Sequence, residues 1–169
     1  HWGVSRPMQR RSWMLATGAA TLLAGCGFRL RGQVPLPYKS VLVEGRDTEL
    51  VQMLKRALAS ETKVVGSAAQ AEAVLRILSE HQERVSTVVD VNGLVSQVQL
   101  RLTVEVAMDA ADGTVLIEAT PLRTTQDMSY SDSQALAMQS EMDLRFQDMR
   151  RAMVSQIMRR MAFAHRTGR

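Results

Sequence analysis

A run of alternating residues between positions 94 and 109 constrains the fold of this chain more than any other feature. Apolar residues recur at every second position over most of the run, and the residues between them are polar or charged. The apolar set is Leu94, Val98, Leu100, Leu102, Val104, Val106 and Met108. A period of two is typical of a strand with one buried face. We therefore expect a sheet with a core on one side and a polar surface on the other.

Turn signals on both sides of this strand predict a meander. Asn92-Gly93 precedes it, and both residues tolerate the positive φ angles of a two-residue hairpin loop. The segment 109–113 predicts a second turn. We expect further extended segments at 74–89 and 114–127, and Pro121 inside the second indicates an edge strand or a bulge.

Helical patterns flank these strands. After a short strand candidate at 41–44, Asp47 or Thr48 is placed to cap a helix that ends near Ser60. A second, longer helix is predicted from about 132 to about 164 by apolar residues at steps of three or four. These residues are Met138, Met142, Phe146, Met149, Met153, Ile157 and Met161. The order of elements predicts an α+β fold, with two helices packed on one face of a four-stranded mixed β-sheet.

The first 26 residues match a bacterial export signal. Arg10 and Arg11 precede an apolar stretch at 13–23, which ends in Leu23-Ala24-Gly25-Cys26, around the only cysteine. This pattern resembles a lipobox, where cleavage before the cysteine is accompanied by attachment of diacylglycerol and acyl chains. We predict a signal peptide at 1–25, a lipidated tether at 26–37 and a single domain at 38–169. A transmembrane helix needs roughly 20 apolar residues, so the apolar stretch at 13–23 is too short to span a membrane. A non-lipidated secretory signal is therefore the remaining alternative.

Location and charge follow from this reading. An aspartate after such a cysteine usually marks retention in the inner membrane, so Gly27 favours a lipid-anchored protein on the periplasmic side of the outer membrane. Removal of residues 1–25 would leave 18 basic against 17 acidic residues. Without a basic tract, we expect no nucleic-acid partner.

The sequence offers little for catalysis. His1, His81 and His165 lie far apart in the chain, and no spacing of metal ligands or phosphate-binding loop is present. We therefore expect no enzyme activity, no catalytic residue, no metal site and no cofactor other than the covalent lipid on Cys26.

Three arginines are the candidates for a binding site. A two-residue loop at Asn92-Gly93 would place Arg84 opposite Arg101, and the second turn would place Arg123 beside Gln99, diagonal to Arg101. Three guanidinium groups on one sheet face would bind an anionic group such as a phosphate. The alternative is an exposed sheet on which neighbouring side chains and solvent satisfy these arginines.

The same register creates a conflict. It places His81 and Glu83 on the apolar face beside Leu102 and Val104. A β-bulge near these residues, or incomplete cover by the helices, would resolve the conflict.

The run Cys26-Gly27-Phe28-Arg29-Leu30-Arg31-Gly32, with Pro35, Val91-Asn92-Gly93 and Ala135-Leu136-Ala137, resembles the LptE family of lipopolysaccharide-assembly lipoproteins. The resemblance implies two helices on a four-stranded sheet. It also implies a protein that plugs and helps to assemble the outer-membrane barrel LptD and takes part in transport of lipopolysaccharide to the cell surface.

The resemblance does not extend to every position. Some relatives carry basic residues, implicated in lipid A binding, just before the Asn-Gly turn and early in the last helix. Val91 and Met138 stand at the matching positions here. Our candidates for direct contact with lipopolysaccharide are therefore Arg84, Arg101 and Arg123. The alternative function is a pilot or chaperone-type lipoprotein for another outer-membrane pore.

Overall fold

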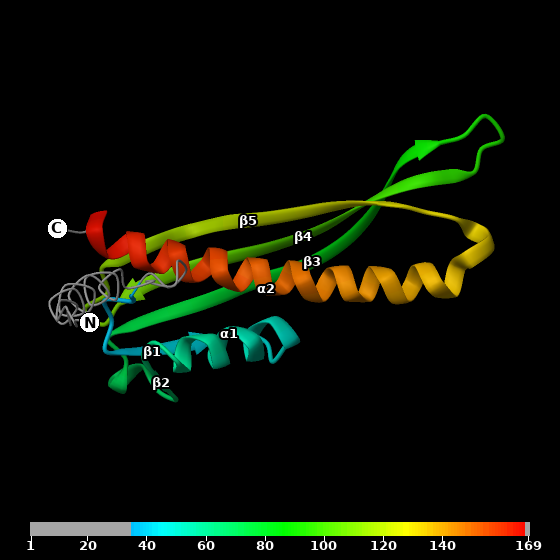
Figure 1. Cartoon of the computed structure of the whole chain (residues 1–169). Coiled ribbons are helices and arrows are strands. Elements are labelled where there is room, and N and C mark those ends of the chain that lie inside the picture. Colours follow the sequence, from blue (N-terminus) through cyan, green and yellow to red (C-terminus); the bar gives the residue numbers. More distant parts are fainter. Residues whose placement is uncertain (1–34, 168–169) are drawn as a thin grey trace, which may run out of the picture. The chain divides into compact units, whose positions relative to one another are not determined.

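The computed structural model describes residues 35–167, with side chains to Ala164. The predicted signal peptide, Cys26 and most of the tether lie outside these residues. In chain order the elements are β1 (Ser40–Glu44), α1 (Glu49–Ala59), β2 (Lys63–Val65), η1 (Ala68–Gln70), β3 (Ala73–Val89), β4 (Val95–Ala110), β5 (Val115–Ser129), η2 (Asp132–Gln134) and α2 (Ala135–Thr167). The strands form one sheet in the order β2-β1-β3-β4-β5 (Figure 1).

The helix α1 begins and ends as its sequence predicts. Thr48 is the N-cap, and its hydroxyl oxygen accepts a hydrogen bond from the Val51 N–H at 3.3 Å, which satisfies one of the free amides of the first turn. Glu49 lies in the first turn, where its charge is favourable to the helix dipole. The helix buries Leu50, Val51, Leu54 and Leu58. It connects β1 to β2, and these two strands are parallel.

The sheet has five strands, where we expected four. The additional strand, β2, is only three residues long and pairs in parallel with β1 from Ser40↔Lys63 to Leu42↔Val65. So short a segment has no readable period, and a Gly-Ser pair follows it directly. The rest of the prediction is confirmed, because β1 also pairs in parallel with β3 and the sheet is mixed.

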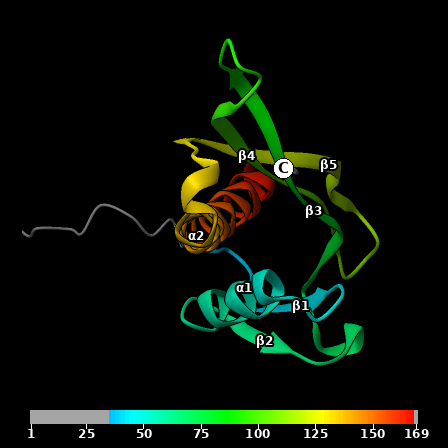
Figure 2. The same ribbon diagram turned by 90° about the vertical axis from the view of Figure 1, so that its right-hand side faces the viewer.

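Both helices cover the same face of the sheet, as expected. α2 lies against β4 and β5 and beside α1 (Figure 2). Its predicted apolar stripe is core, since Met149, Met153, Ile157 and Met161 are fully buried. The buried face of β4 meets them, and its alternation confirms the sequence reading. Near the start of the described chain, the Tyr38 hydroxyl donates a hydrogen bond to the Met161 carbonyl at 2.9 Å.

The hairpin between β3 and β4 closes differently from the prediction. Its loop has three residues, because the Asp90 N–H donates to the Leu94 carbonyl at 2.8 Å. Gly93 occupies the position with positive φ, at 79°. One extra loop residue shifts the pairing by one position, and in a strand such a shift exchanges the two faces. The predicted register of β3 on β4 is therefore wrong.

A bulge in β3 completes the correction. The register shifts between Ile77 and Ser79, so Leu78 is an extra residue in this strand. Ile77 and Glu80 consequently both face the helices, opposite Val106 and Val104. His81 and Glu83, which conflicted with the apolar face in the predicted register, instead share the opposite face with residues 101 and 103.

Candidate functional site at the loop end of the sheet

Arg101 and Arg123 lie on the sheet face that the helices do not cover. Arg101 pairs across the ladder with Glu83, and the distance from Nη1 to the Glu83 Oε2 atom is 3.8 Å. Its Nε–H also donates to the Gln99 side-chain oxygen at 2.8 Å. Arg123 sits opposite Thr103 and donates to its hydroxyl at 3.3 Å. Arg123 is thus diagonal to Arg101, as expected, but its directly opposite residue is Thr103 and not Gln99.

Arg84 is on the other face. It pairs with Leu100, which points toward the helices, and its guanidinium carbon lies 5.4 Å from the centre of the Tyr130 ring. That distance is typical of a cation–π contact. The prediction that Arg84 faces Arg101 is wrong, because the three-residue loop moved β3 by one position. The three arginines therefore do not converge on one face.

On the sheet face that the helices do not cover, called the open face below, oppositely charged and polar side chains contact one another. Arg101 contacts Glu83 and Gln99, and the Gln99 amide donates to Asp127 at 3.0 Å. Further along the face, Arg76 forms an ion pair with Asp109 at 2.5 Å. Exposed ion pairs of this kind contribute about 0 to 1 kcal/mol each. The geometry here matches the alternative of a solvated sheet better than a dedicated anion site.

The tip of the β3–β4 hairpin exposes apolar side chains. β5 ends opposite Gln97, so the hairpin beyond this point has only two strands. Val88, Val89 and Leu94 have exposed fractions of 43%, 55% and 54%, and Val91 is fully exposed. The sequence shows this signal as four apolar residues within the seven positions 88–94.

The start of α2 lies at the same end of the sheet as this tip (Figure 1). Leu136, in its first turn, is 88% exposed. Met138 instead packs against the core. Nearby, Gln139, Met142 and Phe146 of α2 and residues 82–84 of β3 line a cavity of about 380 Å³. Apolar surface, an arginine and a cavity thus occur together at the loop end, and this arrangement suits an amphiphilic ligand.

The described residues offer no cluster of metal ligands. No three His, Cys, Asp or Glu side chains among them converge as metal ligands. Burial raises the pKa of Tyr38, and hydrogen bonds from Thr114 lower the pKa of Asp112. Each shift is explained by local packing or by the turn. No helix within residues 35–167 is both long and apolar enough to cross a membrane.

Comparison with known protein families decides the affiliation. The family model described as LptE, lipopolysaccharide-assembly, matches residues 38–161. The chain belongs to the LptE family. Its LptE-type domain carries both helices and all five strands, and membership supports a role in lipopolysaccharide assembly.

Individual relatives agree with this affiliation. The LPS-assembly lipoprotein LptE of Pectobacterium atrosepticum is 30% identical over 165 residues, with 91% of this chain and 86% of the relative covered. That of Photorhabdus laumondii is 29% identical over 166 residues, covering 94% and 89%. That of Yersinia enterocolitica is 32% identical over 172 residues, covering 94% and 79%.

Solved structures show the same fold. The solution structure of a lipoprotein B from Nitrosomonas europaea has a TM-score of 0.67 at 28% identity, covering 79% of this chain and 88% of that one. The crystal structure of the rare lipoprotein B from Shewanella oneidensis has a TM-score of 0.68 at 23% identity, covering 76% and 97%. The α+β architecture of this LptE-family chain is therefore shared with experimentally determined lipoproteins.

Proposed function

We propose that this protein is a lipid-anchored outer-membrane lipoprotein that plugs and helps to assemble an LptD-like barrel. In this role it takes part in the transport of lipopolysaccharide to the cell surface. Family membership over residues 38–161 carries the proposal. The predicted lipobox at Cys26 supports anchoring on the periplasmic side. No covalent chemistry is required of the protein.

We further propose that lipopolysaccharide contacts the loop end of the sheet. The exposed valines and leucine of the hairpin tip offer apolar surface, and Arg84 offers a cation. Arg101 and Arg123 remain candidates for phosphate contacts on the opposite face, although Glu83 and Gln99 already engage Arg101. Lipid A combines acyl chains with phosphates. The apolar hairpin tip suits the acyl chains, and the arginines suit the phosphates.

The partner is tested by purification of the full, tagged chain from native membranes in detergent, followed by mass spectrometry. We expect a large outer-membrane barrel of the LptD kind at about one to one. A different pore at the same stoichiometry would favour the pilot-type alternative and overturn the proposal. The mass of the N-terminal peptide tests the anchor in the same sample, because a lipidated Cys26 adds the mass of diacylglycerol and an acyl chain.

Glycolipid contact is tested by binding of fluorescent lipopolysaccharide to the purified chain. We expect Arg84→Ala to weaken binding more than Arg101→Ala or Arg123→Ala. Arg101 and Arg123 already donate hydrogen bonds to neighbouring side chains, whereas Arg84 contacts only the face of an aromatic ring in the contacts described above. Unchanged binding in the triple variant would remove the arginines from the proposal.

A further inference from the structure

β3 has a second neighbour only over its first four residues. β1 pairs with β3 only as far as Glu44↔Arg76, and within residues 35–167 no other strand lies on that side. The remaining part of β3 stays in regular antiparallel register with β4 from Ser79 to Ser86. Its outward N–H and C=O groups therefore form an unpaired edge of eight residues in the described chain. Such an edge is a template for another strand.

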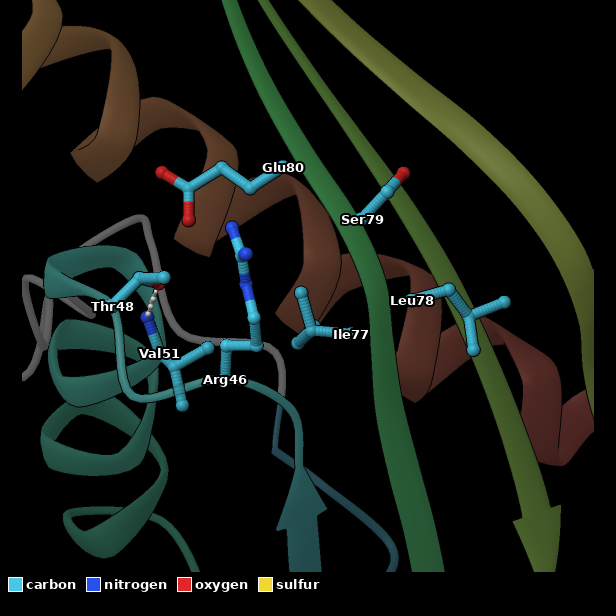
Figure 3. A pocket seen from close by; sticks show the side chains of 7 residues that line it. All are labelled: Arg46, Thr48, Val51, Ile77, Leu78, Ser79 and Glu80. Atoms are coloured by element: carbon cyan, nitrogen blue, oxygen red, sulfur yellow. Dashed lines mark hydrogen bonds between the residues drawn. The ribbon is translucent and has the colours of Figure 1, made fainter.

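The end of β1 explains why this edge is open. Gly45 lies so close to β3 that a Cβ atom there would be 3.1 Å from the Ile77 Cβ atom. After it the chain turns away from β3 and enters α1. The turn leaves a cavity of about 340 Å³ beyond the end of β1, lined by residues 77–80 of β3 and by Arg46, Thr48 and Val51 (Figure 3).

A second cavity follows along the same edge. It is the cavity of about 380 Å³ between residues 82–84 of β3 and the α2 residues Gln139, Met142 and Phe146. The two cavities adjoin neighbouring stretches of β3, one beside α1 and the other beside α2. Together they provide open space along the edge strand, and an added strand occupies such space when a peptide extends a sheet.

The side chains along this edge specify the chemistry of an added strand. The Glu80 Oε2 atom is buried and has no hydrogen-bond partner, although Arg150 lies 4.0 Å from Oε1. In Figure 3 the Arg46 side chain extends toward Glu80. A directly opposed donor stabilises paired strands, so a basic or hydrogen-bonding side chain opposite Glu80 would satisfy the free carboxylate oxygen.

We propose that residues 79–86 of β3 pair with an extended segment of a partner polypeptide, which becomes a further strand of the sheet in line with β1. The segment carries a basic or hydrogen-bonding residue opposite Glu80 and an apolar side chain over Met142 and Phe146. The partner differs from a second copy of this chain. An antiparallel copy with its Arg84 opposite Glu80 would place its residues 88 and 89 opposite Arg76 and Leu75, where β1 already pairs.

Amide hydrogen exchange at single-residue resolution tests the pairing. The full chain is measured alone in detergent and in its complex with the outer-membrane partner, whose existence rests on the proposed function. Alone, amides 79–86 are expected to alternate between slow exchange, where they bond to β4, and fast exchange at the open edge. In the complex the fast set is expected to slow by at least about tenfold, which corresponds to about 1.4 kcal/mol of protection.

Two results would overturn the pairing. The fast amides could remain fast in a complex that protects other surfaces, which would leave the proposed function intact. They could also be slow already in the isolated chain, in which case the edge is not free. If no partner co-purifies, the proposed function fails together with the pairing, and the purification step reports this failure separately.

A pair of proline variants supplies an independent readout. Gln82 and Glu83 are adjacent, so one N–H points to β4 and the other to the open edge. Proline lacks this donor. The proline variant that loses the N–H bonded to β4 should therefore unfold at a lower temperature. The variant that loses the N–H at the open edge should remain stable, yet about tenfold less partner should co-purify with it. The matched variants Gln82→Ala and Glu83→Ala should co-purify with the normal amount of partner. Full recovery by the stable proline variant, or a homodimer of the chain, would refute the pairing.

Discussion

Glu80 of β3 and Arg150 of α2 face each other, with 4.0 Å between Oε1 and Nε. Arg150 also reaches Glu49 at the start of α1, with 3.1 Å between Nη1 and Oε2. One guanidinium thus links both helices to the sheet. The contact exists because the bulge at Leu78 turned Glu80 to the helix side.

Arg150→Ala is expected to lower the free energy of unfolding by roughly 2 kcal/mol, since it leaves the mostly buried Glu80 without its cation. Urea denaturation measures the change. Arg151→Ala is the matched control, because Arg151 pairs with Asp148 on the exposed helix surface and should change stability by less than about 0.5 kcal/mol. Equal effects of the two variants would show that Arg150 does not link the layers.

Tyr38→Phe should cost about 1 kcal/mol, because the buried Met161 carbonyl loses its hydroxyl donor. Burial, with a smaller contribution from Glu72, raises the pKa of Tyr38, so the folded state favours the neutral phenol. The associated stability is complete below the unfolded pKa of about 10 and is lost as the pH rises through the folded value. Thermal unfolding from pH 8 to 11 should show a steeper decline for the wild type than for the variant.

Gly93→Ala should destabilise the protein by about 1 kcal/mol, because alanine is strained at a φ of 79°. Steric contact is not the cause, as no atom lies within 4 Å of an added Cβ. Gly66→Ala is the control, since that site is equally open and carries no such φ. Comparable losses at both sites would argue against the turn geometry as the cause.

Aspartate at the hairpin tip should separate folding from function. Val91→Asp and Leu94→Asp remove exposed apolar surface, so unfolding temperatures should change by no more than a few degrees. Binding of fluorescent lipopolysaccharide should fall by about tenfold for the pair, corresponding to about 1.4 kcal/mol. Thr87→Asp, on the same hairpin, is the control. Normal binding by the double variant would exclude the tip as a lipid contact.

The candidate site was predictable only in part. The arginines were identified as the notable cations of the sheet, but their arrangement depended on one loop residue. A three-residue loop places Arg84 with Tyr130, whereas a two-residue loop would have placed it with Arg101. The lipidation prediction at Cys26 lies outside the described residues and stays a prediction.

The sequence by itself determined the elements whose signals are local. The alternation of β4, the Thr48 cap of α1 and the apolar stripe of α2 each specify their element through periodicity or a single hydrogen bond. The order of these elements also predicted two helices on one face of a mixed sheet, and the structure confirms this arrangement.

Only the tertiary structure decided the pairing of the strands. β2 is strand only because β1 provides a partner, and three residues carry no period. The bulge at Leu78 and the three-residue loop change which face each β3 side chain occupies. Because this strand carries polar residues on both faces, its sequence pattern could not predict the register. The contacts of Glu80 and Arg84 with the helix side of the sheet, and the open edge between them, follow from that register.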